Sequence, residues 1–153
     1  MGHRREARIL ALQALYMVDA AHFRPGQAFA ACKYRMEPPM DEATLAFAKT
    51  LFEGAHKTAA TLDRKIQKCA KNWALERMTS VDLNILRMAA YEMSSDLNTP
   101  VRVIIDESIE IAKKYSSEHS GRFINGLLDA LKDMVAKKNV RPPTKTQKST
   151  AGD

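Results

Sequence analysis

The sequence predicts an all-α protein, a single compact domain of six or seven helices. Apolar residues recur at helical spacing, strict alternation of the strand type does not persist, and six prolines divide the chain into helix-length pieces. The 153 residues are 45% hydrophobic and 27% charged, a composition typical of globular proteins. We expect the helical domain over residues 1–138 and a basic, disordered tail over residues 139–153.

The first half of the chain predicts three helices. The first covers about residues 3–21 and the second about residues 26–35. A long third helix follows Pro38 and Pro39, has Asp41 as its N-cap, and runs to about residue 73. Its apolar stripe consists of Phe52, Ala55, Ala59, Leu62, Ile66, Cys69 and Trp73.

The second half predicts three more helices. Ser80 caps one over about 81–95, Thr99 and Pro100 open one over about 100–116, and Ser120 caps one over about 121–137. The apolar face of the 100–116 helix holds Val101, Ile104, Ile105, Ile109, Ile111, Ala112 and Tyr115. In the last helix Asn125 and Gly126 are poor helix formers. We expect Gly126 to admit a closely packed neighbouring helix and Asn125 to satisfy the backbone groups of a loop.

Two classes of protein are excluded by what the chain lacks. Cys32 and Cys69 stand far apart, so neither a disulfide framework nor a paired-cysteine zinc site is predicted. The apolar stretch 9–18 is too short for a bilayer span, is broken by Gln13 and is followed by Asp19 without a cleavage site. The sequence therefore predicts a cytoplasmic protein that is not exported.

The signatures of catalysis are also missing. The six glycines are scattered, so no phosphate-binding loop or dinucleotide fingerprint is present. Glu53 and His56 lie one helical turn apart, but a metal site would need further His or carboxylate ligands from elsewhere in the chain. A pair of surface residues is the better interpretation. Neither cysteine has a local base and no serine sits in a nucleophile motif. We predict no catalytic residue, no metal and no cofactor, and therefore no enzyme.

The net charge of +6 is concentrated at the two ends. Residues 1–8 carry a net charge of +2 and residues 137–153 a net charge of +4, whereas residues 9–136 hold 16 basic and 16 acidic side chains. Such ends are typical of a protein that meets a polyanion, or of one with solubilising tails.

One stripe of the first helix combines arginine with an aromatic side chain. At helical spacing Arg5, Leu12 and Tyr16 share a face, with Arg8 beside them. Guanidinium groups bind phosphate and an exposed aromatic ring stacks on an unpaired base. The alternative is that Leu12 and Tyr16 belong to the core while the arginines are merely solvated, and spacing alone leaves both open.

Four ordered segments resemble the NusB family. Arg4, Arg5 and Arg8, followed by residues 12–16 (LQALY), resemble its arginine-rich first helix. The other three segments are residues 85–93 (ILRMAAYEM), 100–114 (PVRVIIDESIEIAKK) and 120–129 (SGRFINGLLD). The resemblance covers nearly the whole chain and is strongest from residue 80 to residue 131.

The resemblance implies a bacterial transcription antitermination factor with a NusB-like helical fold. Family members pair with the ribosomal protein NusE, bind the boxA RNA of ribosomal RNA operons, and load onto RNA polymerase with other Nus factors. By this analogy Arg4, Arg5 and Arg8 contact RNA phosphates, and Tyr16 and Phe123 lie near the bases. Glu76 and Asp82 match acidic positions near the RNA and NusE surfaces.

Two residues depart from the family pattern. Glu6 interrupts the arginine run with a negative charge. His119 stands where family members commonly have Asp, and an imidazole donates to phosphate or stacks on a base where a carboxylate would repel RNA. We therefore add His119 to the predicted RNA-binding residues, with an affinity that rises as the pH falls.

Two other interpretations remain open at this point. NusB-like domains also begin some RNA cytosine methyltransferases, but those chains continue into a cofactor-binding domain whereas this sequence ends after a short basic tail. The chain is alternatively a helical scaffold or dimerisation module, and a homodimer would hide the arginine helix. RNA affinity that falls steeply with salt separates an RNA-binding protein from a scaffold.

Overall fold

The computed structural model of the chain describes residues 2–71 and 74–139. Within those ranges it contains seven α-helices and one short 3-10 helix, and no strand. The helices are α1 Gly2–Ala21, α2 Pro25–Tyr34, α3 Glu42–Lys57, α4 Ala59–Cys69, the 3-10 helix Leu75–Arg77, α5 Ser80–Ser94, α6 Val101–Tyr115 and α7 Glu118–Asn139. The all-α prediction is confirmed. The predicted tail, apart from Asn139, and the end of the predicted third helix at residues 72–73 lie outside the described residues.

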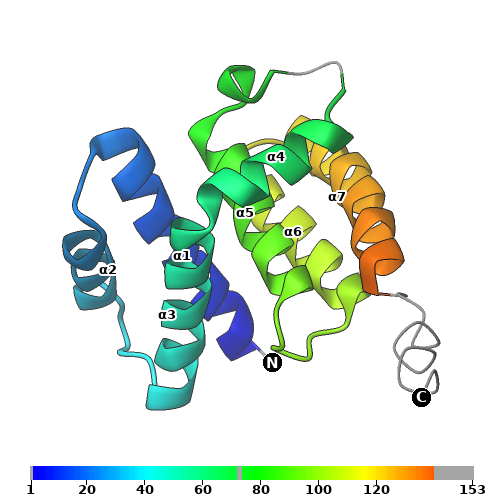
Figure 1. The fold of residues 1–153 in the computed structure, drawn as a ribbon. Coiled ribbons are helices and arrows are strands. Elements are labelled where there is room, and N and C mark those ends of the chain that lie inside the picture. Colours follow the sequence, from blue (N-terminus) through cyan, green and yellow to red (C-terminus); the bar gives the residue numbers. More distant parts are fainter. Residues whose placement is uncertain (1, 72–73, 140–153) are drawn as a thin grey trace, which may run out of the picture.

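Helix α5 occupies the middle of the molecule (Figure 1). It packs against α1 and α3 on one side and against α4, α6 and α7 on the others. Ten of the fifteen residues of α5 are buried, so nearly every side of the helix is covered by its neighbours. An almost fully buried helix is typical of the centre of a bundle, and the remaining helices surround it.

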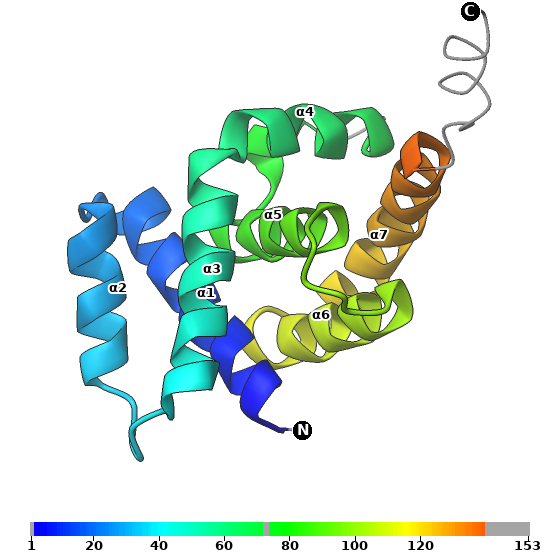
Figure 2. The ribbon, with the colours of Figure 1, turned by 60° about the horizontal axis from the view of Figure 1, so that its bottom comes forward.

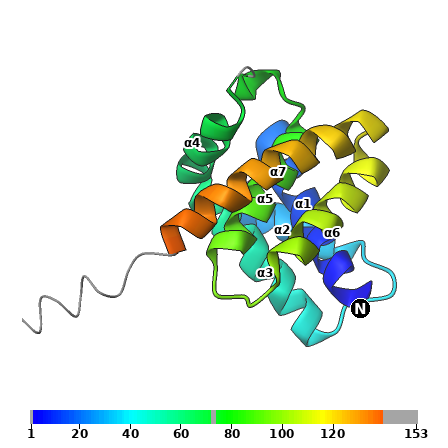
Figure 3. The same ribbon diagram turned by 90° about the vertical axis from the view of Figure 1, so that its right-hand side faces the viewer.

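Helix α1 organises the other half of the fold. It packs against α2, α3 and α5, with its fully buried face made by Ala7, Leu10, Ala11 and Ala14. The small alanine side chains on this face let neighbouring helices approach closely. Helices α6 and α7 lie side by side on the far flank of α5 (Figures 1 and 3).

The predicted long helix over residues 41–73 is wrong, because it is two helices. Asp41 caps α3 as predicted, its Oδ1 accepting a hydrogen bond of 2.7 Å from the Thr44 N–H. The chain leaves α-geometry at Thr58, whose hydroxyl donates to the Gly54 carbonyl oxygen at 2.7 Å. Helix α4 then packs on α5 and runs at a steep angle to α3 (Figure 2).

Two of the helical glycines, Gly54 and Gly126, have opposite surroundings. A Cβ on Gly54 would overlap the ring of Tyr91, so this glycine is what lets α3 and α5 meet. A Cβ on Gly126 would enter open space, and Asn125 beside it is exposed. The prediction that Gly126 admits a neighbouring helix is therefore wrong, and the close approach takes place at Gly54 instead.

None of the helices within the described ranges is both long and apolar enough to cross a bilayer.

Candidate nucleic-acid interface

The first turns of α1 present two of the three predicted arginines to solvent. Arg4 and Arg5 are exposed, as is Glu6, whereas Ala7 and Arg8 are buried. The guanidinium carbon of Arg4 lies 4.0 Å from the centre of the Phe47 ring, a cation–π contact that orders the side chain without using its hydrogen-bond donors. The unpaired N–H groups of a helix N-terminus add further positive potential at this end.

Arg8 does not reach the surface. Its Nε and Nη2 donate to the two carboxylate oxygens of Glu92 on α5, at 3.0 and 2.7 Å. The Arg8 side chain is 3% exposed and that of Glu92 is 1% exposed. A phosphate can reach this guanidinium only if the buried pair breaks. The predicted contact between Arg8 and phosphate is therefore corrected: a carboxylate 84 residues away in sequence holds Arg8 inside the fold.

Arg5 is held at the surface by a carboxylate. Its Nε and Nη2 donate to the two oxygens of Glu107 on α6, at 2.7 and 2.9 Å. The hydrogen bonds from Arg5 lower the pKa of Glu107, against the opposing effect of desolvation, and the same pair raises the pKa of Arg5. Both groups are thus charged at neutral pH, and the guanidinium stays accessible because the Arg5 side chain is 48% exposed.

Beyond Arg5 a shallow hollow of about 260 Å³ runs between α1 and α6. Lys113 and Lys114 border it together with Arg5. The Lys114 Nζ lies 5.5 Å from the centre of the Tyr115 ring. The basic groups of α1 and α6 therefore lead directly to an aromatic side chain.

Tyr16 is on the surface, 42% exposed, whereas Leu12 is in the core. Tyr16 borders a hollow of about 510 Å³ with Tyr115, Arg35 and Val81. Of the two interpretations of the α1 stripe, a core position holds for Leu12 and an exposed, accessible ring holds for Tyr16. An exposed aromatic pair beside an arginine has the composition of a stacking site for unpaired bases.

His119 and Phe123 border a third hollow, of about 250 Å³, with Arg77 and Asp82. The Ser120 hydroxyl donates to Asp82 Oδ2 at 3.0 Å, while the buried Oδ1 has no hydrogen-bond partner among the described residues. This hollow and the Tyr16 hollow share the start of α5, because Val81 borders one and Asp82 the other. Asp82 is therefore next to the predicted RNA-binding residues.

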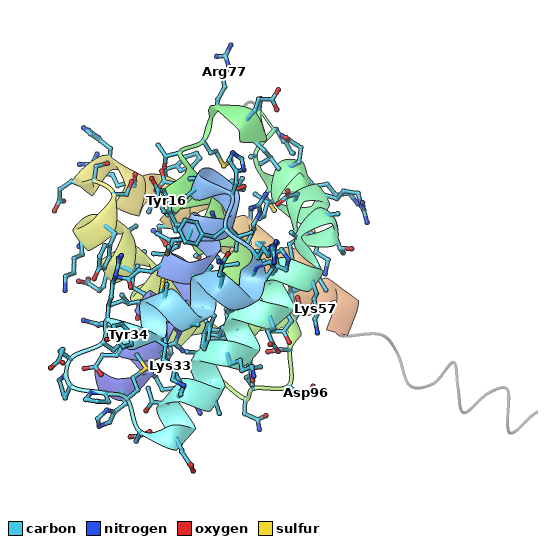
Figure 4. All side chains as sticks on the ribbon, turned by 90° about the vertical axis from the view of Figure 1, so that its left-hand side faces the viewer. Tyr16, Lys33, Tyr34, Lys57, Arg77 and Asp96 are labelled. Atoms are coloured by element: carbon cyan, nitrogen blue, oxygen red, sulfur yellow. The ribbon has the colours of Figure 1, made fainter. Side chains whose placement is uncertain are left out.

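Glu76 lies apart from these residues. It is exposed in the 3-10 helix and does not border any of the three hollows described above. Its neighbour Arg77 does border the Phe123 hollow and points away from the body of the molecule (Figure 4).

We call the surface formed by the three hollows and the exposed arginines of α1 the α1–α6 strip. Of the predicted residues, Arg5, Tyr16, Asp82, His119 and Phe123 border its hollows, and Arg4 precedes Arg5 on α1 with its guanidinium over the Phe47 ring. Sequence reasoning missed Arg35, Arg77, Lys113, Lys114 and Tyr115. Tyr115 was predicted as core because it follows the apolar periodicity of α6, but at the last turn of that helix the packed layer ends and its ring is 37% exposed.

The part of the chain that the structure describes offers neither a metal site nor an activated thiol. No group of three or more His, Cys, Asp or Glu side chains could hold a metal ion there. Burial raises the pKa of the thiols of Cys32 and Cys69, which disfavours the reactive thiolate form.

Comparison with known proteins gives the family. The sequence profile of the NusB family matches residues 5–133. The transcription antitermination protein NusB of Elusimicrobium minutum (strain Pei191) is 50% identical over 133 residues, which cover 86% of this chain and 94% of that protein. The chain resembles the solved structure of T. maritima NusB with a TM-score of 0.77 and 32% identity, over 85% of this chain and 90% of that one.

A second solved structure contains partners. It is a crystal structure of the antitermination factors NusB and NusE in complex with dsRNA, and the matching chain has a TM-score of 0.80 and 25% identity, over 88% of this chain and 98% of that one. The profile match covers most of the sequence, and both the identity and the fold agree with it. The chain belongs to the NusB family.

Proposed function

We propose that this protein is a transcription antitermination factor that binds the boxA RNA of ribosomal RNA operons together with NusE. The relatives that it matches over most of their length carry the name transcription antitermination protein. A solved relative was crystallised with NusE and RNA. These relationships favour antitermination over a scaffold and over a methyltransferase domain.

The observation that carries the proposal is the α1–α6 strip. It joins the exposed guanidinium groups of Arg4 and Arg5 to aromatic rings at Tyr16, Tyr115 and Phe123. Proteins bind single-stranded nucleic acid by this combination, since cations follow the phosphates while rings stack on the bases. Along α1 alone, Arg5 and Tyr16 are separated by about 16 Å at 1.5 Å per residue, a span of several nucleotides.

The residues of the strip have different proposed roles. Arg4 and Arg5 contact phosphates, and Tyr16 and Phe123 stack on bases. His119 donates a hydrogen bond to phosphate or base from the edge of the Phe123 hollow. Arg8 takes a positioning role, because its buried ion pair with Glu92 fixes α1 against α5.

The acidic residues Glu76 and Asp82 are proposed for the NusE side of the assembly. Asp82 stands beside the RNA residues and Glu76 on the exposed 3-10 helix, so a partner that covers both would lie next to the bound RNA. The complex would then act on RNA polymerase together with other Nus factors.

The proposed role also bears on where the protein works, on its basic C-terminal segment and on self-association. A factor that binds nascent transcripts works in the cytoplasm. Residues 1–138 would form the RNA-binding domain, and the basic segment 139–153 would add salt-sensitive attraction to RNA without sequence specificity. A homodimer that covers α1 would be an inactive form.

A transcription assay tests the proposed function. RNA polymerase, NusE and the other Nus factors transcribe a template on which boxA precedes a terminator. Adding this protein should increase read-through, and scrambling boxA should abolish the increase. Read-through that does not change on adding the protein, or that ignores boxA, would contradict the proposal.

A further inference from the structure

A groove across α2 from the Tyr16 hollow is not used by the proposed function. Helices α2 and α3 both pack on α1, and between them they leave a groove of about 660 Å³. The rings of Phe29 and Phe52 bridge the two helices, stacked with their centres 5.4 Å apart. This volume lies in the range of natural ligand and peptide sites.

The groove has an apolar floor and a basic rim. Phe29, Leu45 and Phe52 border it from within, and Phe52 also stacks on His56. The rim carries three exposed lysines, Lys33, Lys49 and Lys57. None of these lysines forms an ion pair within the part of the chain that the structure describes, and Glu53 is the one carboxylate among the lining residues.

The charges are placed along the length of the groove. Lys33 stands near the end of α2 and Lys57 at the end of α3, well apart on the face seen in Figure 4. Tyr34 follows Lys33 and is 90% exposed, which adds an aromatic surface at that end. Exposed tyrosines of this kind are enriched in protein interfaces.

The groove is separate from the α1–α6 strip. Helix α2 divides them, because Cys32, Arg35 and Met36 border the Tyr16 hollow while Gly26, Phe29 and Lys33 border the groove. A ligand in the groove would therefore leave the RNA-binding residues free.

We propose that the groove between α2 and α3 docks an acidic amphipathic helix of a protein partner. Apolar side chains of such a helix, spaced by three or four residues, would fill the floor. Its carboxylates would pair with Lys33, Lys49 and Lys57, an electrostatic match at the rim. The basic C-terminal segment of this chain has the wrong charge for the site. RNA bases would find little free ring surface for stacking, because Phe29 and Phe52 stack on each other and Phe52 is only 3% exposed.

A peptide selection tests the proposal on the full chain. Short peptides displayed on phage are selected against the immobilised protein, and the enriched sequences are synthesised with a fluorescent label. We expect enrichment of Asp and Glu, with aromatic or aliphatic residues at helical spacing. A selection that enriches no such peptide would overturn the proposal.

Three variants locate the binding. Ala30→Trp fills the groove from its exposed α2 side, and Lys49→Glu reverses a rim charge. Each should weaken peptide binding on the order of tenfold, which corresponds to about 1.4 kcal/mol. Lys68→Glu, an exposed lysine on α4 outside the groove, is the matched control and should leave the affinity unchanged.

The same variants are tested for binding to boxA RNA. Ala30→Trp and Lys49→Glu should bind RNA as the unmodified protein does, which separates this inference from the proposed function. Peptides that bind Ala30→Trp at full affinity lie elsewhere and contradict the proposal. If Lys49→Glu weakens RNA binding but not peptide binding, the groove belongs to the RNA surface.

Discussion

Arg8 and Glu92 form a two-hydrogen-bond ion pair that joins α1 to α5 inside the fold. Both side chains are almost fully buried, and the guanidinium carbon of Arg8 also lies 5.4 Å from the centre of the Phe47 ring. Phe47 thereby contacts both Arg8 and Arg4, one beneath the surface and one at it. The buried ion pair thus fixes α1 against α5, and the position of α1 determines where Arg4 and Arg5 are exposed to solvent.

Removing one member of this pair should destabilise the protein. Arg8→Ala leaves the Glu92 carboxylate buried without its partner, so the free energy of unfolding should fall by about 3–5 kcal/mol. Urea denaturation followed by circular dichroism measures the change. The double variant Arg8→Met, Glu92→Leu removes both charges and should recover most of the stability.

The same double variant separates structure from RNA contact. Because Arg8 does not meet RNA in our account, the slope of log affinity against log salt should match that of the unmodified protein. A slope reduced by about one unit would mean that Arg8 neutralises a phosphate after all.

Because Arg5 is paired with Glu107, an RNA phosphate must compete with the Glu107 carboxylate for the Arg5 guanidinium. Arg5→Ala should weaken boxA RNA binding by about 1–2 kcal/mol and reduce the salt slope by about one unit. The free energy of unfolding should change by less than about 1 kcal/mol, because the ion pair is at the surface. Equal losses of stability and affinity would make Arg5 a structural residue.

Glu107→Gln is the informative partner variant. It keeps the size of the side chain but removes the charge that holds Arg5, so RNA binding should become tighter. Fluorescence anisotropy with a labelled boxA RNA measures both variants. Weaker binding by Glu107→Gln would show that Glu107 positions Arg5 for RNA instead of competing with it.

Tyr16 should contribute by stacking. Tyr16→Ala is expected to weaken RNA binding by about 1–3 kcal/mol, the range for one base on an aromatic ring. Tyr34→Ala is the matched control, since Tyr34 is more exposed than Tyr16 but borders none of the hollows of the strip. Similar losses in both variants would mean that the strip is not the RNA track.

His119 should make RNA binding depend on pH. The imidazole of His119 borders the Phe123 hollow, and a protonated imidazole donates from both ring nitrogens and attracts phosphate more strongly than a neutral one. Arg77 and Asp82 border the same hollow, one adding and one offsetting charge. RNA affinity measured at successively lower pH should rise in the unmodified protein and stay flat in His119→Ala. An unchanged pH profile in that variant would refute the assignment.

Replacing Gly54 or Gly126 by alanine should change the free energy of unfolding in opposite directions. Gly54→Ala should lower the free energy of unfolding by about 1–3 kcal/mol, because the new methyl group overlaps the Tyr91 ring. Gly126→Ala should raise it by up to about 1 kcal/mol, because the site is open and alanine is the better helix former. Thermal unfolding of both variants checks the signs, and a loss of stability in Gly126→Ala would mean that its surroundings are closed.

Most of the fold could be predicted from the periodicity of apolar residues, and the error at Thr58 shows the limit of that signal. The break between α3 and α4 occupies one residue, so the stripe from Phe52 to Ile66 keeps its spacing across it. Thr58 is neither proline nor glycine, and its hydroxyl bond to Gly54 is a common helical contact. The change of direction comes from packing on α5, which a local pattern does not contain.

The candidate site shows the same limit for single residues. Periodicity placed the arginines on the first helix, but it could not tell that Glu92 removes Arg8 from the surface. That pairing depends on a residue far along the chain and on the crossing of α1 with α5. Tyr115 and Arg77 were missed for the same reason, since each joins the strip only through the placement of other helices.

The most direct test of the proposed function is the affinity of the full 153-residue chain for a short labelled boxA RNA, measured across a salt series with and without NusE. If the proposed function is correct, NusE tightens binding, scrambling boxA removes this gain, and affinity falls steeply with salt. Binding that is indifferent to both NusE and the RNA sequence would contradict it, because a basic helical surface alone would then explain the interaction.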